Sequence, residues 1–185
     1  SYSAPIAVNT PMVVRARVLT GTNWSAELSN PFYPPQDLSR LLVTEIMYHP
    51  APDALGLTDP DDFEFLELKN AGATTLNLSG LWFSGITFTF TNGTTLSPGQ
   101  FFVLVRNPAQ FAARHPGVTI NGVYTGKLDN GGETITLSHA LGGKVLSVTY
   151  DDLAPWPVAP DGFGFSLVPV DPNANSDFDN PASEN

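Results

Sequence analysis

Apolar and polar residues alternate over short stretches of this chain rather than in long helical stripes. In residues 86–90, one Ile and two Phe alternate with two Thr, which is the period of a strand with one buried face. An unbroken apolar run at 101–105 predicts a central strand. About eight short segments of this kind, separated by turns rich in Gly, Pro and Asn, follow one another between residues 41 and 170. The pattern predicts an all-β fold, an antiparallel β-sandwich.

One short helix is expected among these strands. Asn107 is a favourable N-cap, and Pro108 suits the first helical position. The pair Pro116 and Gly117 ends any helix that begins there. The sandwich is therefore expected to carry one minor helix of about two turns.

The spacing of strands and prolines divides the chain into four segments. Residues 1–33 hold two or three strands, too few to close a sandwich, and we interpret them as the C-terminal strands of a truncated β-domain. Pro31 is expected to interrupt strand pairing, and residues 34–40 form a Pro-rich linker. The main sandwich occupies residues 41–170. Residues 171–185 are polar and acidic, and are expected to form a flexible tail.

The chain is strongly acidic, with a formal net charge of −10. Such a charge repels nucleic acids and anionic membrane surfaces, so no nucleic-acid partner is expected. No stretch approaches the roughly 20 apolar residues of a membrane span, and no membrane insertion is expected. There is no Cys, which excludes disulfides and thiolate metal ligands. Few Lys and many Thr, Asn, Gly and Pro favour an exported bacterial protein, extracellular or at the cell surface.

Catalytic chemistry finds little support in the sequence. The three His residues, His49, His115 and His139, are scattered over a loop, the end of the predicted helix and a turn. A nucleophilic enzyme needs a base beside its nucleophile, and the chain has neither a Gly-x-Ser-x-Gly motif nor a Cys. We therefore predict that the chain is not an enzyme and has no catalytic residues.

Carboxylates are the main candidates for a metal site. Asp59, Asp61 and Asp62 lie at short spacing in one loop, and calcium prefers such oxygen ligands; the alternative is a solvated loop. Glu45 and Glu67 lie in neighbouring predicted strands among apolar residues, where a carboxylate needs a hydrogen bond, an ion pair or a cation. No cofactor is expected unless these residues bind calcium.

A tryptophan is the candidate for contact with an organic ligand. Trp156 stands between two prolines in a predicted loop, where an exposed ring can stack on a sugar or another ligand. The alternative is packing of the ring on the core. Trp82 stands beside Phe83 in a strand pattern and is assigned to the core.

The order of motifs along the main segment resembles the lamin tail domain family in its bacterial form. The motifs are Glu-Ile-Met-Tyr at 45–48, Phe-Glu-Phe-Leu-Glu-Leu-Lys-Asn at 63–70, Leu-Ser-Pro-Gly-Gln at 96–100 and the stretch around Asn-Gly-Gly-Glu at 130–133. The resemblance implies an immunoglobulin-like β-sandwich. Residues 1–33 resemble the end of a fibronectin-III or chitobiase C-terminal-like module.

The resemblance also implies a class of function. Bacterial members lie in exported multidomain proteins, and our leading hypothesis is a non-catalytic binding or scaffolding module for adhesion or attachment. Its partner would be a protein or a cell-surface carbohydrate, and the chain by itself is expected to be monomeric. The alternative is a calcium- or carbohydrate-binding accessory domain of a multidomain extracellular enzyme. The DNA contact of animal lamins is not carried over, because this chain is acidic and has no basic patch.

Overall fold

The computed structural model describes residues 4–169. The chain forms two compact units, Ser1–Gln36 and Asp37–Asn185. The boundary between them falls within the Pro-rich stretch at 34–40. The tail expected at 171–185 lies outside the described residues.

The first unit is a two-stranded antiparallel ribbon. Strand β1 (Met12–Ala16) pairs with β4 (Leu28–Phe32), and β2 (Leu19–Thr20) pairs with β3 (Asn23–Trp24). Pro31 lies inside β4, opposite Val13, so the expectation that it interrupts pairing was wrong. An edge strand tolerates proline because one row of its N–H groups faces away from the partner strand.

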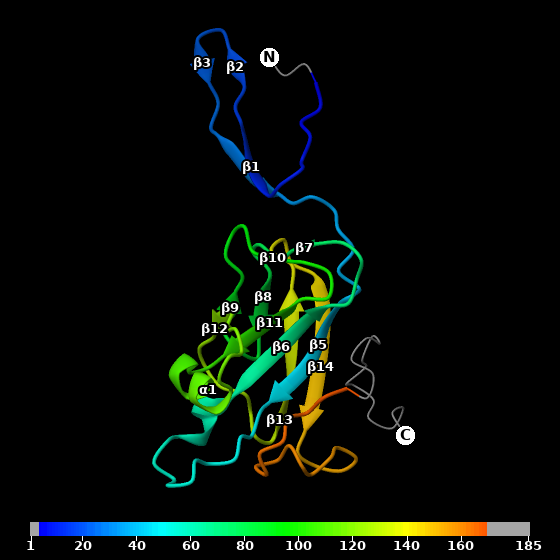
Figure 1. The fold of residues 1–185 in the computed structure, drawn as a ribbon. Coiled ribbons are helices and arrows are strands. Elements are labelled where there is room, and N and C mark those ends of the chain that lie inside the picture. Colours follow the sequence, from blue (N-terminus) through cyan, green and yellow to red (C-terminus); the bar gives the residue numbers. More distant parts are fainter. Residues whose placement is uncertain (1–3, 170–185) are drawn as a thin grey trace. The chain divides into compact units, whose positions relative to one another are not determined.

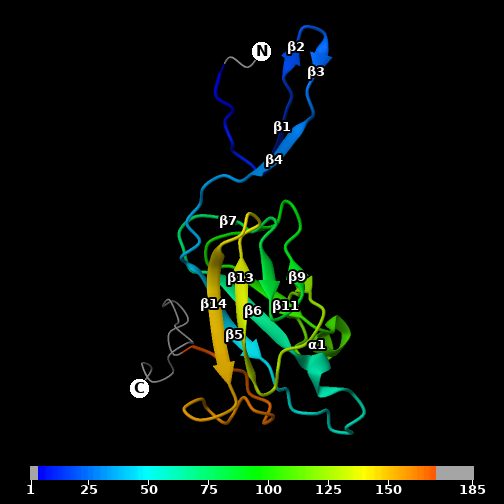
Figure 2. The ribbon, with the colours of Figure 1, turned by 180° about the vertical axis from the view of Figure 1, so that it is seen from behind.

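The second unit contains two four-stranded sheets (Figures 1 and 2). The first has the order β12-β11-β6-β5, with β5 (Leu41–Met47), β6 (Phe65–Asn70), β11 (Phe101–Val105) and β12 (Gly122–Val123). The second has the order β14-β13-β8-β9, with β8 (Trp82–Ser84), β9 (Phe88–Thr89), β13 (Gly132–Ser138) and β14 (Lys144–Asp151). All neighbours are antiparallel except β11 and β12. A small extra pair joins β7 (Leu76–Asn77) to β10 (Thr95–Leu96).

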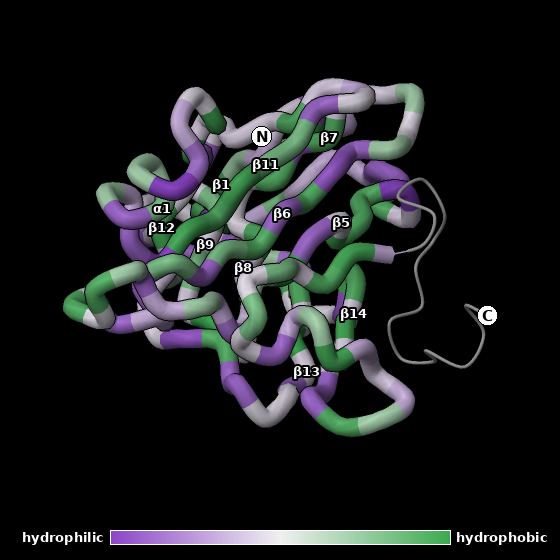
Figure 3. The backbone as a smooth tube through the Cα atoms, turned by 60° about the horizontal axis from the view of Figure 1, so that its bottom comes forward, coloured by the Kyte–Doolittle hydropathy of each residue, from purple (hydrophilic) through white to green (hydrophobic). Residues whose placement is uncertain are grey.

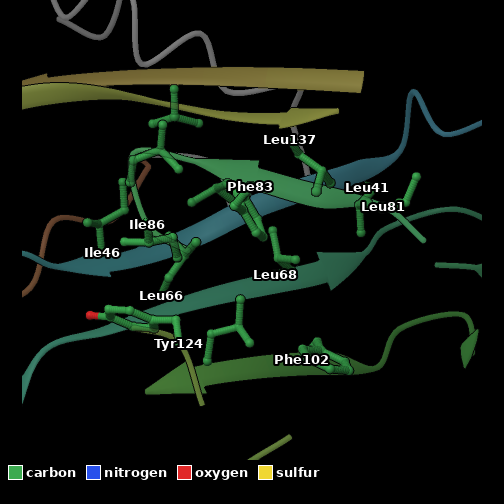
Figure 4. Close-up of a cluster of buried hydrophobic side chains, with 14 of the residues drawn as sticks. Leu41, Ile46, Leu66, Leu68, Leu81, Phe83, Ile86, Phe102, Tyr124 and Leu137 are labelled. Atoms are coloured by element: carbon green, nitrogen blue, oxygen red, sulfur yellow. The ribbon is translucent and has the colours of Figure 1, made fainter. Parts of the chain in front are cut away.

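The main core lies between the two sheets. Ile46 and Leu66 of the first sheet and Phe83 and Leu137 of the second belong to one buried cluster. Figure 4 shows these side chains directed into the space between the layers. The alternation of inward and outward residues along each strand places the apolar set on the inner faces. The predicted all-β, immunoglobulin-like sandwich is confirmed.

A second, smaller core lies on the outer face of the first sheet. Helix α1 (Pro108–Arg114) covers this face, and its Phe111 packs in one cluster with Phe65 and Val105. Asn107 caps the helix as predicted: its Oδ1 accepts hydrogen bonds from the backbone N–H groups of residues 109 and 110. Because β11 is covered on both faces, it reads as an unbroken apolar run (Figure 3). Within residues 4–169, no helix is long and apolar enough to cross a membrane.

Two details differ from the sequence prediction. Trp82 is 40% exposed, while its neighbour Phe83 is buried; alternation along β8 allows only one of the two to face the core. The last of the segments expected to form strands, residues 164–168, is reduced to one bridge between Ile46 and Leu167. Gly164 has a positive φ of 85°, which lies outside the strand region and interrupts the extended conformation before Leu167.

Candidate functional site

The acidic loop is shaped by a short 3₁₀ helix, η1 (Pro60–Phe63). Asp59 is its N-cap, and its side chain accepts a hydrogen bond from the backbone N–H of Asp61. Proline at the first helical position suits this turn because its missing N–H would have no partner there. Phe63 is buried and anchors the turn to the sandwich. The run Asp-Pro-Asp-Asp-Phe therefore forms an ordered turn rather than a loose loop.

Two basic residues neutralise this loop. The guanidinium of Arg106, just after β11, lies 3.5 Å from Asp59, 3.5 Å from Asp62 and 3.9 Å from Asp61. The ammonium of Lys127 lies 3.2 Å from the carboxylate of Asp61. The chain has only eight Lys and Arg residues, and two of them serve this cluster. The three predicted aspartates thus converge, and a cationic side chain lies among them.

A surface depression of about 540 Å³ opens beside this cluster. Arg106, Lys127 and Asp62 supply charges to its wall, and Tyr124 supplies an aromatic ring. An open depression with both signs of charge suits a polar group of a partner better than an apolar ligand.

Glu64, beneath this depression, is the ionisable residue that the sequence did not single out. It is 0% exposed. Its Oε2 accepts hydrogen bonds from the Tyr124 hydroxyl and from the backbone N–H of Leu128, each at 2.9 Å. Its Oε1 is buried and has no hydrogen-bond partner among the described residues. Burial raises the pKa of Glu64 to about 7, because a charged carboxylate loses its hydration there.

A signal for Glu64 was present in the sequence but was not used. Glu64 lies between Phe63 and Phe65, and a strand beginning at 63 would place it on the face opposite to both. The strand begins instead at Phe65, after η1. Glu64 follows η1 in an extended conformation, on the same face of the chain as Leu66 and Leu68 of the main core, so alternation directs its side chain inward.

The other two predicted ligands, Glu45 and Glu67, are cross-strand neighbours in β5 and β6. Thr44 Oγ1 donates a hydrogen bond to Glu67 Oε1 at 2.7 Å, and Ser166 Oγ donates one to Glu45 Oε1. Burial, and to a lesser extent the charge of Glu45, raises the pKa of Glu67. Both carboxylates thus have hydroxyl partners, which is the hydrogen-bonded alternative considered above.

The predicted metal ligands therefore lie in two separate places. Asp59, Asp61 and Asp62 surround Arg106, whereas Glu45 and Glu67 pair across two strands. Within the described part of the chain, no group of three or more His, Asp or Glu residues is arranged to hold a metal ion. Calcium binding stays a prediction.

The three histidines lie in different surroundings. His49 Nδ1 lies 2.6 Å from Asp161 Oδ1. His115 ends α1 and packs against the ring of Phe111. His139 lies in the turn between β13 and β14, where its Nδ1 accepts a hydrogen bond from a backbone N–H. Each has a local structural contact, as expected for residues scattered along the sequence.

Trp156 is half-buried and packs against the main core. Its backbone N–H donates a hydrogen bond to the carbonyl of Leu153 at 3.0 Å. The exposed aromatic residues of the same loop are Phe163 and Phe165, which the sequence analysis did not single out. The Gly residues on either side of Phe163 marked a turn, but not the direction of its side chain.

Comparison with known proteins agrees with the fold. No curated protein matches the chain. The family model described as Lamin Tail Domain matches residues 34–152. The match takes in every strand from β5 to β14 as well as η1 and α1, and it confirms the resemblance seen in the sequence. Because it covers more than half of the chain, the protein belongs to the lamin tail domain family.

Proposed function

We propose that this chain is a non-catalytic binding and scaffolding module, which serves adhesion or attachment in a larger exported bacterial protein. One observation carries the proposal: large apolar side chains are left exposed on an ordered loop of the sandwich and along the ribbon. Exposed apolar surface of this kind marks sites of contact with other molecules. The immunoglobulin-like fold of the family is consistent with such a module.

The use of charged residues supports the same proposal. Arg106 and Lys127 are paired with the acidic loop, and Glu64 is held by Tyr124 and Leu128. These side chains stabilise and shape the protein. The low Lys content and the many Thr, Asn, Gly and Pro residues favour export.

The ribbon supports a second element of the proposal, that residues 1–33 belong to a separate β-domain. An isolated two-stranded ribbon is marginally stable in water. Val13, Leu19, Trp24 and Leu28 are all exposed on it. Amide hydrogen exchange tests this: we expect rapid exchange in β1 and β4 of this chain, and strong protection there would contradict the proposal.

A binding experiment tests the function. The chain is immobilised and exposed to cell-surface and cytosolic fractions of the source bacterium, with an unrelated protein of similar acidity as the control. We expect specific retention from the cell-surface fraction, reversed by excess soluble chain. Equal retention on the acidic control, or retention only from the cytosol, contradicts the proposal.

The second candidate function is a calcium-binding accessory domain. It is favoured by the gathering of Asp59, Asp61 and Asp62 within 4 Å of the Arg106 guanidinium. A ligand that binds only the folded state raises the melting temperature. Melting in millimolar calcium and in EDTA therefore tests it, and a rise that EDTA reverses would favour this candidate.

A further inference from the structure

The loop that follows β14 has a defined shape. The backbone N–H of Gly162 donates a hydrogen bond to the carbonyl of His49 at 3.0 Å. Leu167 exchanges two backbone hydrogen bonds with Ile46, and Trp156 packs on the main core. The loop, residues 152–166, is thus held at several points along its length. All of it except residue 152 lies beyond the segment 34–152 that matches the family model.

This loop presents apolar side chains outward. Leu153, Val158, Phe163 and Phe165 are 67%, 65%, 67% and 63% exposed, and Figure 3 shows hydrophobic positions along the chain after β14. Such large side chains are favourably removed from water, at about 25 cal/mol per Å² of apolar area. Because the loop is anchored nearby, these side chains are held outside the core. We call these four residues and the backbone between them the apolar loop surface.

Three carboxylates accompany this surface. Asp151, Asp152 and Asp161 belong to the same stretch, and no Lys or Arg follows Lys144 in the sequence. Asp151 accepts a hydrogen bond from the backbone N–H of Leu153, and Asp161 is bonded to His49. The stretch therefore has a local excess of negative charge without a basic residue of its own.

Contacts of Tyr48 and its neighbour His49 place these carboxylates around one part of the sandwich. Tyr48 is 1% exposed, and its hydroxyl has no hydrogen-bond partner among the described residues. Burial, and after it the charges of Asp161, Asp152 and Asp151, raises the pKa of Tyr48 to about 12. The ring of Tyr48 packs against that of Tyr150, the residue before Asp151, with centroids 4.6 Å apart, and Asp161 is bonded to His49, the residue after Tyr48, at 2.6 Å. Three negative charges thus lie in and beside the stretch that carries the apolar loop surface.

These features define the chemistry of an occupant. A partner that binds here must bring a positive charge to pair with the carboxylates and apolar groups to cover the four exposed side chains. A second copy of this chain, with its net charge of −10, or an anionic membrane would be repelled. A Lys or Arg on an apolar protein surface meets both requirements, because its long stem packs on apolar groups while its charge reaches the carboxylates.

We propose that the apolar loop surface docks a protein partner that inserts a Lys or Arg side chain, flanked by apolar residues, toward Asp151, Asp152 and Asp161. The inference rests on the proposed binding function and names its surface and the kind of partner. The pairing of charge with apolar contact gives both specificity and affinity.

A peptide-binding experiment tests this chemistry with the full 185-residue chain. The probes are a peptide of alternating Lys and Leu and a matched peptide of alternating Glu and Leu. We expect the Lys/Leu peptide alone to bind. The double variant Phe163→Ser/Phe165→Ser leaves the net charge unchanged and should weaken binding by about tenfold. Equal affinity in wild type and double variant would overturn the inference, since charge alone would then explain binding.

A matched control uses Leu141, which is also exposed but lies between β13 and β14. Leu141→Ser should leave the affinity within about twofold of wild type. Asp152→Asn should weaken binding and reduce its dependence on salt. Self-association in sedimentation, or binding to phosphatidylcholine or phosphatidylglycerol vesicles that the Phe variants abolish, would assign the surface to a different occupant and overturn the inference.

A crosslinking experiment separates this inference from the proposed function. A photoreactive amino acid is placed at position 163 or at position 141, and each chain is exposed to the cell-surface fraction. Crosslinks at 163 to a segment with a basic residue flanked by apolar ones support the inference. Crosslinks only at 141, or at 163 to a segment without a base, contradict the inference but leave the function standing. No crosslink from either position, together with no specific retention in the binding experiment, contradicts both.

Discussion

The ribbon and the sandwich are built from similar strands, yet only one of them has a core. In the ribbon, Trp24 and Leu28 lie on paired strands and are 62% and 64% exposed. In the sandwich, Leu66 and Leu137 lie on paired strands and are fully buried. The difference is the second layer: hydrogen bonding within a sheet orders the backbone, but apolar faces leave water only when another layer covers them.

The glutamates of the two units also differ in how far they are buried. In the ribbon, Arg15 and Arg17 both pair with Glu27, at 3.5 and 3.2 Å, on an exposed surface. Such pairs contribute about 0 to 1 kcal/mol each. In the sandwich, Glu64 is buried and held by hydrogen bonds. Replacing Glu27 in the ribbon should therefore change the free energy of unfolding little, whereas replacing Glu64 in the sandwich affects a buried hydrogen-bonded group.

The largest predicted effect compares one leucine from each unit. Leu66→Ala removes a fully buried side chain between the sheets, and should lower the free energy of unfolding by about 4 kcal/mol through lost burial and the cavity left behind. Leu28→Ala in the ribbon should lower it by less than about 0.5 kcal/mol. Guanidinium chloride unfolding followed by tryptophan fluorescence measures both. Equal losses in the two variants would mean that the ribbon has a core of its own.

The second prediction concerns the pH dependence of stability. The pKa of Glu64 is raised from 4.5 to about 7 by burial. An acid whose pKa is higher in the folded chain stabilises the fold below its unfolded pKa and loses that contribution as the pH rises. Stability should therefore fall by roughly 3 kcal/mol between about pH 4.5 and pH 7 through this one group.

Substitution isolates the contribution of Glu64 from those of other groups. Glu64→Gln keeps an oxygen acceptor for Tyr124 and Leu128 but cannot ionise, so the fall across this pH range should flatten. The variant should then be more stable than wild type at pH 8. Glu27→Gln in the ribbon is the control and should leave the curve unchanged. A wild-type curve that is already flat, or a Glu64→Gln curve as steep as that of wild type, would contradict the assignment.

The third prediction concerns a buried amide. Asn70 Nδ2 donates hydrogen bonds to the carbonyls of Thr74 and Leu96, both at 2.8 Å, and its Oδ1 accepts one from the N–H of Gly72. Asn70→Ala leaves these groups without partners and should destabilise the sandwich by about 2 kcal/mol. Asn30→Ala on the exposed ribbon is the matched control, with an expected change below about 0.5 kcal/mol. Similar denaturation midpoints for Asn70→Ala and wild type would contradict this role.

The smallest predicted effect concerns the acidic loop. Arg106→Gln removes the cation among three carboxylates and should lower stability by less than about 1 kcal/mol, an effect that high salt reduces. Millimolar calcium should leave the melting temperature of wild type unchanged and raise that of the variant, because calcium can then replace the missing charge. A rise in wild type that is as large as in the variant would instead favour the calcium-binding candidate.

Local sequence signals predicted the elements of the sandwich well. The helix begins at Pro108 because Asn107 caps it, and the run at 101–105 forms β11 because both of its faces are covered. The strand expected at 164–168 failed because Gly164 turns the chain, and Trp82 was placed in the core when Phe83 lies there. In a strand, one of two consecutive residues faces the core, but the sequence pattern of Trp82 and Phe83 does not show which of them does.

The candidate site required more than local signals. The sequence identified Asp59, Asp61 and Asp62 as a group, because they lie within four positions of one another. Their partner Arg106 is more than forty positions away, and folding alone brings it to within 4 Å of all three. Glu64 was not singled out because both faces of the strand after it carry apolar residues, and only the fold shows that its own face, shared with Leu66 and Leu68, lines the main core.

The sequence by itself determined that this protein is an all-β member of the lamin tail domain family, because the period of its apolar residues and the order of its turns are local properties. Only the tertiary structure decided which ionisable groups are neutralised, which one is buried and which apolar residues stay exposed. Those outcomes depend on contacts between distant segments. Asp161 meets His49, and Leu167 pairs with Ile46, only when the segment after β14 folds back onto β5 and the residues that follow it.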